Sequence, residues 1–331
     1  MNQLSQRFSL PPDISTHGAD IDLLIDFMHY FMIFLFVAWG LFMLYCLIRF
    51  RQRPGHKAEY NPAGGTIPKF AEIAIVIIEV ILLVVFTMPV WASMKDESKF
   101  PSPSEATEIR VIAQQFEWEI HYPGPDGIFG PTDLKLIDDE TNPIGLDRSH
   151  PDAKDDITTR KQMHAPVNKP VLIHLTSKDV IHSFWIPMLR IKQDVIPGMK
   201  ISIWFEATQT SDEVRQELKR TVNVPKDGGS DERYAKLLIK QTLMKAYAGL
   251  PAGSSIDEEA LATLRQAGVT EIEIGPASPI EIQCAQLCGN EHYTMNGWFT
   301  SETQEEFDKW MEQQAMFLGD DEDDWDDEEE E

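Results

Sequence analysis

The sequence predicts a membrane-anchored all-β protein: a two-helix transmembrane hairpin, then an antiparallel β-sandwich with a helical insertion. Three observations lead to this fold class. Two long apolar segments lie near the N-terminus, short alternating strand patterns follow them, and one helical stretch interrupts the strands. The 331-residue chain has a net charge of −25, which argues against a nucleic acid partner because phosphate binding needs a basic surface. Basic protein partners stay open.

The two apolar segments are long enough to cross a bilayer. Residues 30–48 carry no formal charge, and as a helix they extend about 28 Å, close to the ~30 Å hydrocarbon core. They are apolar on every face, which disfavours a buried helix of a soluble core. The second segment contains Glu79, either a protonated carboxyl packed against a neighbouring helix or a group with a proton-related role. The expected units are an external segment (1–22) and a hairpin (23–95) with spans over about 27–49 and 72–94.

The charges around the hairpin predict its orientation. The connection between the spans carries five basic residues, whereas the outer flanks are acidic or mixed. The positive-inside rule therefore places the connection in the cytoplasm and both termini outside. The first 22 residues contain one basic residue, Arg7, and show no signal-peptide pattern.

The external part of the chain reads as many short strands. Alternating or β-branched runs are separated by turn-rich segments such as residues 122–127, which is typical of an antiparallel sandwich. We assign residues 100–208 and 279–317 to this sandwich. The expected strands cover residues 108–114, 171–175, 201–205 and the run that contains Ile280 and Ile282.

Residues 209–278 break the strand pattern and turn helical. Ser230 can cap a helix that reaches about Ala248, and Ser255 with Glu258 fits a capping box at the start of a second helix. This helical insertion is either a surface element without a binding role or a docking element for another subunit.

The chain ends in an acidic tail, residues 318–331. Asp320 to Glu331 contains eleven carboxylates, which repel one another and offer almost no apolar surface, so we expect no fixed structure. The tail either aids solubility or raises the local concentration of a basic partner.

A run of soft metal ligands lies near the C-terminal end. Cys284, Cys288, His292 and Met295 offer two thiolates, an imidazole and a thioether within twelve residues. Soft sulfur combined with imidazole suits copper, and two thiolates can bridge two copper ions. Each ion would then need its own imidazole, and His182, in an apolar segment, is available as the second one.

Other interpretations of these residues stay open. Cys284 and Cys288 can form a disulfide outside the cell, and with His292 they can bind zinc, although Met295 would then have no role. His182 by itself would more often be a core histidine. The conjunction of the two segments favours copper.

Together these features resemble subunit II of cytochrome c oxidase, the haem–copper terminal oxidase. The resemblance implies a cupredoxin fold and a dinuclear copper centre called CuA. It also implies a multi-pass protein of the bacterial inner membrane with its copper domain on the periplasmic face. The matching features are the two-span hairpin and the segments Gln115–Trp118, Asp179–Pro187, Lys192–Gly198 and Cys284–Met295.

The resemblance also implies a function and a ligand set. Copper would take single electrons from a c-type cytochrome and pass them to haem a in subunit I, where haem and CuB reduce oxygen to water and protons are pumped. Subunit I, other oxidase subunits and membrane lipid are the implied partners. Cys284 and Cys288 would bridge two copper ions, joined by His182, His292, Met295 and the backbone carbonyl of Gln286.

Three residues depart from the family pattern. Gln286 replaces the usual Glu, which removes a carboxylate that also reaches a magnesium ion at the subunit interface. Phe116 replaces the Trp through which electrons enter, and with Trp118 it marks the expected path. Lys178 stands where many relatives place an acidic residue. The last two changes favour another docking mode, such as a membrane-anchored or fused donor.

Glu72, at the start of the second span, matches the family's carboxylate near a proton pathway in subunit I. Its local alternative is an acid favoured by the positive N-terminal end of a helix.

Three other functions compete with this interpretation. A copper-free structural subunit of a quinol oxidase has the same hairpin and sandwich, but the intact ligand set argues against it. A nitrous-oxide-reducing enzyme shares the copper site but would need a large additional catalytic domain. A copper carrier would release metal too slowly from such a buried, mixed ligand set.

Overall fold

The computed structural model describes residues 10–55, 57, 66–226 and 231–323. It divides into two compact units, which are described separately: residues 1–11 with 17–99, and residues 12–16 with 100–331.

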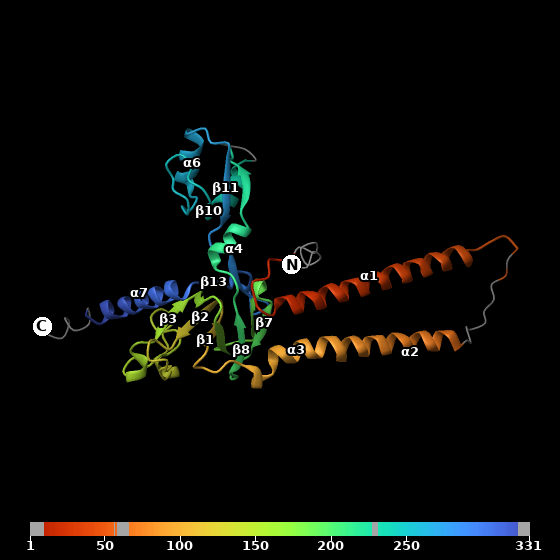
Figure 1. Ribbon diagram of the computed structural model, residues 1–331, viewed down its shortest axis with the longest axis horizontal. Helices are drawn as coiled ribbons and strands as arrows, with labels where there is room; N and C mark the ends of the chain where they lie inside the picture. Colours follow the sequence, from red (N-terminus) through yellow and green to blue (C-terminus); the bar gives the residue numbers. More distant parts are fainter. Residues whose placement is uncertain (1–9, 56, 58–65, 227–230, 324–331) are drawn as a thin grey trace. The chain divides into compact units, whose positions relative to one another are not determined.

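The first unit is a helical hairpin (Figure 1). Its two apolar stretches, Gly18–Arg49 and Lys69–Lys95, are each long enough to span a membrane, as expected. The rings of Phe27 and Phe86 stack at 5.1 Å between centroids, so the two stretches pack against each other. The elements are α1 (Gly18–Arg49), α2 (Thr66–Ile81), the π-helical η1 (Leu82–Thr87), α3 (Met88–Lys95) and the 3-10 turn η2 (Glu97–Lys99).

Two five-stranded sheets form the sandwich of the second unit. The first sheet has the order β3-β2-β1-β5-β8 and the second has the order β4-β13-β12-β6-β7. In the first sheet these are β1 (Thr107–Gln114), β2 (Glu117–Tyr122), β3 (Ile157–Arg160), β5 (Pro170–Ser177) and β8 (Ile201–Glu206). In the second they are β4 (Gln162–Pro166), β6 (His182–Ile186), β7 (Ile191–Val195), β12 (Ile280–Cys284) and β13 (Asn296–Glu302).

Alternating side chains of both sheets fill the core between them. Trp118 packs edge-on against Phe184 at 5.3 Å, and Phe205 packs against Phe299 at 5.4 Å. Each pair joins the two sheets, and all four rings are at most 1 % exposed. Burial of one such side chain contributes about 1.5–3 kcal/mol. The four strand regions that the sequence predicted are all strands in the structure.

The sandwich differs from the expectation in one respect, because it is not purely antiparallel. β1 runs parallel to β5, and β13 runs parallel to β4. Parallel neighbours need long crossover connections, and these pairs are joined through distant parts of the chain. Side-chain alternation along one strand does not reveal the direction of its neighbour.

A short N-terminal segment belongs to the sandwich unit. Ile14 is fully buried, and its backbone N–H donates to the carbonyl of Met188 at 3.0 Å. Its carbonyl accepts from Thr208 N at 2.8 Å, and Ser15 forms a bridge with Ala207. Part of the expected external segment therefore extends the edge of the first sheet.

The insertion contains helices, as expected, and also a three-stranded antiparallel sheet, which the sequence analysis did not predict. Its apolar core includes Leu243, Leu261 and Ile274. The strands lie in the order β10-β11-β9. The elements are α4 (Ser211–Glu217), β9 (Arg220–Asn223), α5 (Asp231–Leu238), β10 (Gln241–Leu243), α6 (Glu258–Gln266) and β11 (Glu271–Pro276).

The end of the first helix and the start of the second helix predicted within the insertion were wrong, whereas the stop expected at Gly268 is confirmed by its left-handed φ of 68° just after α6. The helix expected to reach Ala248 ends at Leu238, because Lys240 takes a left-handed φ of 72° and the chain continues as a strand. Its expected cap, Ser230, lies outside the described residues. The second helix is capped by Asp257, which accepts from Ala260 N at 2.7 Å, rather than by Ser255. Ile256 is fully buried and hydrogen-bonded to β10, so the helix cannot begin there.

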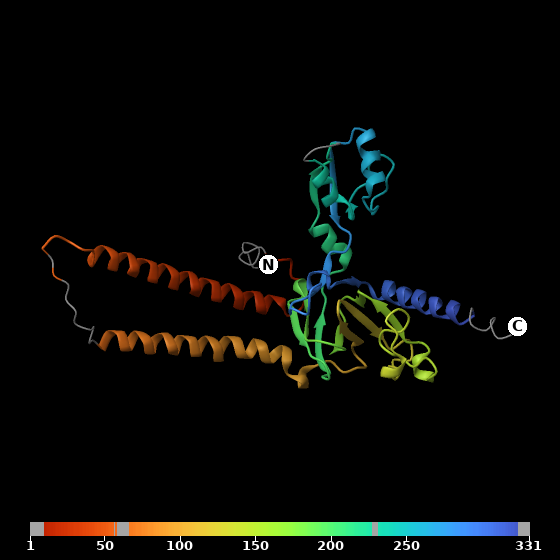
Figure 2. The same cartoon turned by 180° about the vertical axis from the view of Figure 1, so that it is seen from behind.

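The C-terminal helix α7 (Gln304–Asp323) reaches into the segment expected to be disordered. Residues 318–323 are helical, which corrects that expectation, and residues 324–331 lie outside the described part. Extending an existing helix fixes one residue per added hydrogen bond, so it is far easier than starting one. In Figure 2 the helix is blue, and the irregular segment between β2 and β3, with turns η3 (Leu134–Leu136) and η4 (Pro151–Ala153), is yellow-green.

Candidate metal centre

Two neighbouring strands of the second sheet bring the distant ligand segments together. β6 begins at His182, β12 ends at Cys284, and the strands pair with Cys284 opposite Phe184. After β12 the chain turns back through the 3-10 turn η6 (His292–Thr294) before β13 begins. This return loop, residues 285–295, brings Cys288 and His292 close to the first residue of β6, His182. His182 and Cys284 lie close together although they are 102 positions apart in the sequence.

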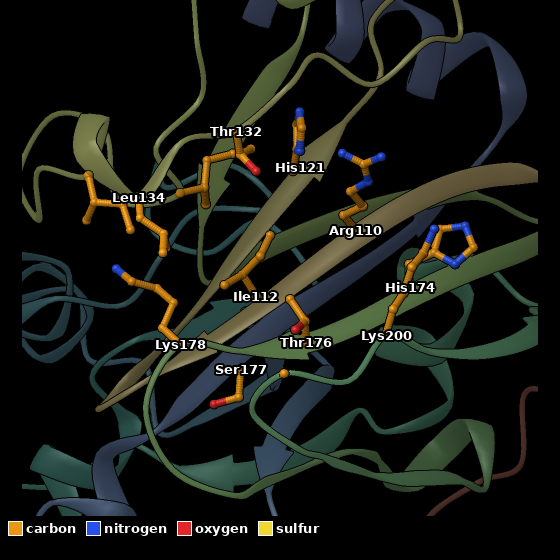
Figure 3. Close-up of a pocket in the computed structure, with 13 residues that line it drawn as sticks. Arg110, Ile112, His121, Thr132, Leu134, His174, Thr176, Ser177, Lys178 and Lys200 are labelled. Carbon is orange, nitrogen blue, oxygen red and sulfur yellow. The ribbon is translucent and has the colours of Figure 1, made fainter.

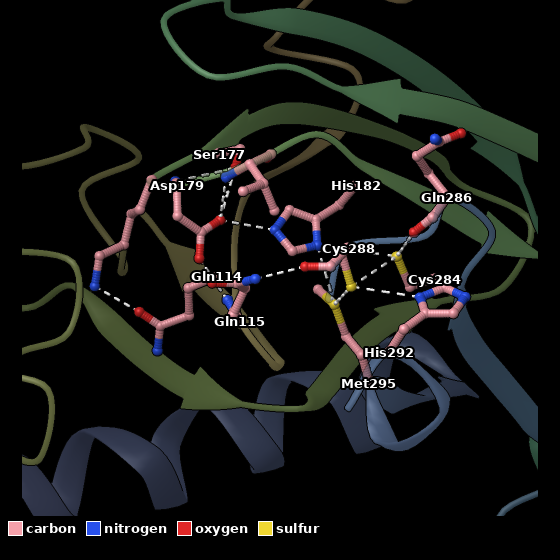
Figure 4. A network of polar contacts seen from close by, with 12 residues as sticks. Gln114, Gln115, Ser177, Asp179, His182, Cys284, Gln286, Cys288, His292 and Met295 are labelled. Atoms are coloured by element: carbon pink, nitrogen blue, oxygen red, sulfur yellow. Dashed lines mark hydrogen bonds and ion pairs between the residues drawn. The ribbon is translucent and has the colours of Figure 1, made fainter. Parts of the chain in front are cut away.

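His182, Met295 and Cys284 form one side of the centre (Figure 4). His182 Nδ1 lies 3.1 Å from Met295 Sδ and 3.9 Å from Cys284 Sγ. The carbonyl oxygen of Gln286 lies 3.2 Å from Cys284 Sγ, whereas the Gln286 side chain is directed away from the sulfurs. The backbone oxygen of Gln286 is therefore the part of this residue that faces the centre.

Cys288 joins this group to the second imidazole. Its sulfur lies 4.0 Å from Cys284 Sγ, 3.7 Å from Met295 Sδ and 3.4 Å from His292 Nδ1. The two thiols are not joined to each other. The structure thus brings all six residues expected as ligands into one place, and their role as ligands stays a prediction.

The centre is largely shielded from water, yet it lies close to the protein surface. His182, Met295 and Cys288 are 0, 2 and 4 % exposed. Leu287 and Tyr293, in the same return loop, are 75 and 84 % exposed. Such exposed apolar side chains beside a buried polar centre are typical of a contact surface.

Hydrogen bonds from two further residues, Asp179 and Gln115, hold the candidate ligand segments in place. Asp179 Oδ1 lies 2.8 Å from His182 Nε2. Gln115 contacts both ligand segments, because its backbone N–H donates to Asp179 Oδ2 at 2.7 Å and its side-chain amide donates to the Cys288 carbonyl at 2.5 Å. Sequence reasoning missed both residues, although Asp179 stands three positions before His182, a spacing that suits such a contact.

The two thiols differ in acidity. Burial alone would raise the pKa of Cys284, but hydrogen bonds with His182 and the backbone of Ser183 outweigh it and hold that pKa below its ordinary value. Burial and the neighbouring Cys284 sulfur raise the pKa of Cys288 to about 12. A bound cation favours the ionised form of both thiols, so binding at this pair would release protons.

Phe116 and Trp118 lie next to different parts of the centre, the loop at Gly289 and the ring of His182 respectively. Phe116 is half-buried and packs on the return loop, since a Cβ added to Gly289 would come within 3.0 Å of its ring. Trp118 is fully buried, and its ring lies edge-on to His182 with 6.2 Å between centroids. The structure therefore places both aromatic residues next to the candidate ligands.

The remaining residues singled out in the sequence lie away from this cluster. Lys178 binds Gln114 Oε1 at 2.5 Å and the Pro143 carbonyl at 2.7 Å, so it stabilises the fold instead of extending into solvent. Glu72 is exposed in the second turn of α2, which rules out a role at the helix N-terminus because the dipole effect is confined to the first turn. Glu79 is exposed one turn before η1.

Comparisons with known proteins agree with this description. Residues 108–213 match the family model "Cytochrome C oxidase subunit II, periplasmic domain". The "alternative cytochrome c oxidase subunit 2" of Bradyrhizobium diazoefficiens is 26 % identical over 307 residues, which cover 92 % of this chain and 84 % of that protein. Two further relatives, both named "cytochrome c oxidase subunit 2", are each 28 % identical to this chain. The Synechocystis protein matches 60 % of this chain, and the Cereibacter sphaeroides protein matches 50 % of it.

The chain spans less than two thirds of the latter two relatives, 64 and 56 % of their lengths. Among solved structures, the periplasmic domain of subunit II of cytochrome oxidase from Bradyrhizobium japonicum is 19 % identical, covers 66 % of this chain and 99 % of that chain, and has a TM-score of 0.33. The family match over residues 108–213, which include part of the sandwich, and the relative that extends across the hairpin agree with each other. The chain therefore belongs to the subunit II family of cytochrome c oxidase.

Proposed function

We propose that this chain is the subunit through which electrons enter a cytochrome c oxidase, and that its return loop and His182 hold two copper ions. One observation supports this most strongly. Two unjoined cysteine sulfurs lie 4.0 Å apart, and each has a different imidazole nitrogen within 4 Å. The proposed ligands are His182, Cys284, Cys288, His292, Met295 and the carbonyl of Gln286.

The donor set fits copper better than zinc. Met295 Sδ lies within 4 Å of both His182 and Cys288, and a thioether is a soft ligand that copper accepts and structural zinc sites do not use. When bound, the copper pair supplies a one-electron acceptor and donor. The protein's part is to hold the ligands on two paired strands, to fix His182 through Asp179 and to keep water out.

The surface beside the return loop suits an electron-donating partner. Phe116 is half-buried over Gly289, and Leu287 and Tyr293 expose apolar side chains nearby in the chain. We assign this surface to a c-type cytochrome and haem a of subunit I to the accepting side. Lys178 is not part of the surface, because its ammonium group is held by Gln114 and Pro143.

The membrane arrangement follows from the same proposal. The basic connection between the spans lies in the cytoplasm, and the sandwich lies on the periplasmic face of a bacterial inner membrane. Proteolysis of intact spheroplasts should cut the external domain and spare residues 49–69. Cleavage of that connection from outside would overturn the orientation.

Metal analysis of the purified oxidase tests the copper proposal. The wild-type complex, assembled with ample copper and zinc, should contain two copper ions per copy of this chain beyond those of subunit I, and a multi-line mixed-valence EPR signal. A single copper ion, or zinc in its place, would refute the proposal. A subunit without metal would instead favour the copper-free subunit of a quinol oxidase.

A further inference from the structure

A cavity of about 600 Å³ lies on the outer face of the first sheet (Figure 3), and none of the candidate copper ligands lines it. Its floor is a row of side chains from three adjacent strands. Arg110 on β1 stands opposite His121 on β2 and His174 on β5, and Ile112 stands opposite Thr176. The neighbouring residues of β1 point into the sandwich core, so this row faces outward.

The irregular segment between β2 and β3 covers the row. Ile144 packs in a small apolar cluster with Leu146 and Ala153, and Ile112 packs against that cluster. The cluster fastens the covering segment to the sheet. The cavity between them has the size of ordinary small-molecule sites, which are about 300–1,000 Å³. Apolar walls come from Ile112, Leu134, Ile137 and Ile144.

The lining is positively charged, although the chain as a whole is strongly acidic. Its 13 residues include Arg110, Lys178 and Lys200 and no Asp or Glu. The two histidines are neutral contributors, because burial lowers the pKa of both His121 and His174. The positive charge therefore belongs to the arginine and the two lysines.

The nearest carboxylates already bind other groups, although Asp156 Oδ1 has no hydrogen-bond partner within the described residues. Asp156 Oδ2 lies 2.6 Å from His121 Nε2 and accepts from Gly130 N at 2.8 Å. Glu108 Oε1 lies 3.1 Å from His174 Nε2. These acids lie behind the lining, where they offset part of the charge without filling the cavity.

Arg110 lies within the field of Asp156 and Glu108, but within the described residues neither carboxylate forms a direct ion pair with it. Its guanidinium carbon lies 3.9 Å from the centroid of the Phe129 ring, so the flat face of the group is covered. Within the described ranges, no hydrogen bond or ion pair engages its N–H groups. A half-buried guanidinium with a stacked face and a free edge is suited to a bidentate pair with a carboxylate or a phosphate.

We propose that this cavity binds a small organic anion, whose phosphate or carboxylate group pairs with Arg110 and Lys200 and whose apolar part rests on Ile112 and Leu134. Lys178 contributes less, because its ammonium group binds Gln114 and the Pro143 carbonyl and is ion-paired with Asp139 Oδ1 at 3.5 Å. Lys200 is exposed at the rim, so it can close on the anion. The site is independent of the copper ligands.

Calorimetric titration of the full chain in detergent tests the proposal with three probes: phenyl phosphate, inorganic phosphate and benzyl alcohol. Phenyl phosphate should bind saturably and more tightly than inorganic phosphate, and benzyl alcohol should not bind. Arg110→Gln should weaken phenyl phosphate binding about tenfold or more, because a charge-assisted hydrogen bond is lost. Lys219→Gln, which changes an exposed lysine outside the cavity, should leave the affinity unchanged.

A second variant, Lys200→Gln, covers the case in which Arg110→Gln fails to fold. Lys200 is exposed, so its replacement should leave the fold intact and still weaken phenyl phosphate binding. If phenyl phosphate does not bind the wild-type chain saturably at concentrations up to about 10 mM, the proposal is overturned, because a dissociation constant above that value means negligible binding. Wild-type affinity in both variants would overturn it as well.

Nanodiscs distinguish a lipid headgroup from a free solute as the natural occupant. If phosphatidylglycerol in the disc competes with phenyl phosphate, the occupant is a lipid phosphate. If binding is equal in discs of phosphatidylcholine alone and discs that contain phosphatidylglycerol, the occupant is a solute. Both results support the cavity as an anion site, and loss of binding in both kinds of disc would refute it.

Discussion

Asp179 Oδ1 lies 2.8 Å from His182 Nε2, while the other ring nitrogen of His182 faces the sulfurs of Cys284 and Met295. Asp179 is 30 % exposed, and its pKa lies below the ordinary value because hydrogen bonds with His182 and Gln115 outweigh its partial burial. An ionised carboxylate only accepts, so Nε2 carries a proton, and Nδ1 is the nitrogen that would bind a metal after losing any proton it shares with Cys284. The carboxylate thus selects the tautomer that can bind a metal.

Changing Asp179 to Asn should therefore weaken metal binding without removing a ligand. We expect the copper affinity to fall about 10- to 100-fold, as for other residues that orient a metal-binding histidine. Competition with a copper chelator measures this. Asp194→Asn is the matched control, since Asp194 is exposed on β7 and makes no contact with the centre. Equal affinities in the two variants would show that Asp179 does not orient His182.

Replacing either of the two cysteines proposed to bridge copper with serine should abolish the mixed-valence EPR signal. A hydroxyl does not replace a bridging thiolate, so Cys284→Ser and Cys288→Ser should each leave fewer than two copper ions per chain. Cys46→Ser provides the control, because Cys46 lies in α1 and not among the candidate ligands. A two-copper mixed-valence spectrum that survives in either variant would contradict bridging by thiolates.

Truncating Phe116 to Ala should slow oxidation of the natural cytochrome donor and leave the copper spectrum intact. The Phe116 ring packs over Gly289 in the return loop, so removal of the ring opens the surface there without changing an atom of a candidate ligand. Stopped-flow kinetics measures the rate, with Leu237→Ala, an exposed residue of the insertion, as control. Phe116→Trp should keep the rate high. An unchanged rate in the Ala variant would remove Phe116 from the electron path.

Glu119 should make folding stability depend on pH. Burial raises its pKa to about 7, and Arg160, 3.5 Å away but 40 % exposed, offsets this only in part. The unfolded chain ionises near pH 4.5, so between pH 4.5 and 7 the folded state holds one more proton and stability falls as pH rises. Thermal unfolding should show a smaller loss over this range in Glu119→Gln than in wild type and in Glu281→Gln, an exposed control. Identical pH profiles in all three proteins would disprove this.

Deleting residues 320–331 should change association with the donor and nothing else. The tail carries eleven carboxylates, and their attraction for a basic partner acts mainly on the association rate, within a screening length of ~8–10 Å. Copper content and maximal turnover should stay the same. The association rate at low salt should fall and its salt dependence should flatten. The same rate and salt slope in the truncated enzyme would leave the tail without a docking role.

Sequence patterns predicted the parts of the fold that depend on local periodicity. The two spans and the strands that contain Ile109 and Ile203 were identified because each repeats its apolar side chains at the spacing of its own structure, and the strand that contains Ile173 was identified as an apolar run after Pro170. The partners of those strands could not be predicted. Whether β1 lies beside β5, and in which direction, depends on contacts some 60 residues apart, which periodicity does not encode.

The same limit explains what was missed in the insertion and at the metal centre. β10 has only three residues, too few to show alternation, and the helical propensity around it continues past Lys240. Ligand residues were found because their chemistry is unusual. Asp179 and Gln115 are ordinary residues, and their role appears only when two loops meet.

The pairing of β6 with β12 has a consequence for biosynthesis. His182 is translated early, but Cys284, Cys288 and His292 follow only after the whole insertion has left the ribosome. The candidate site therefore does not exist on a partly made chain, and an early metal ion would meet only one of the candidate ligands, His182. If the chain holds the proposed copper pair, its loading is therefore a late maturation step that needs both thiols still reduced.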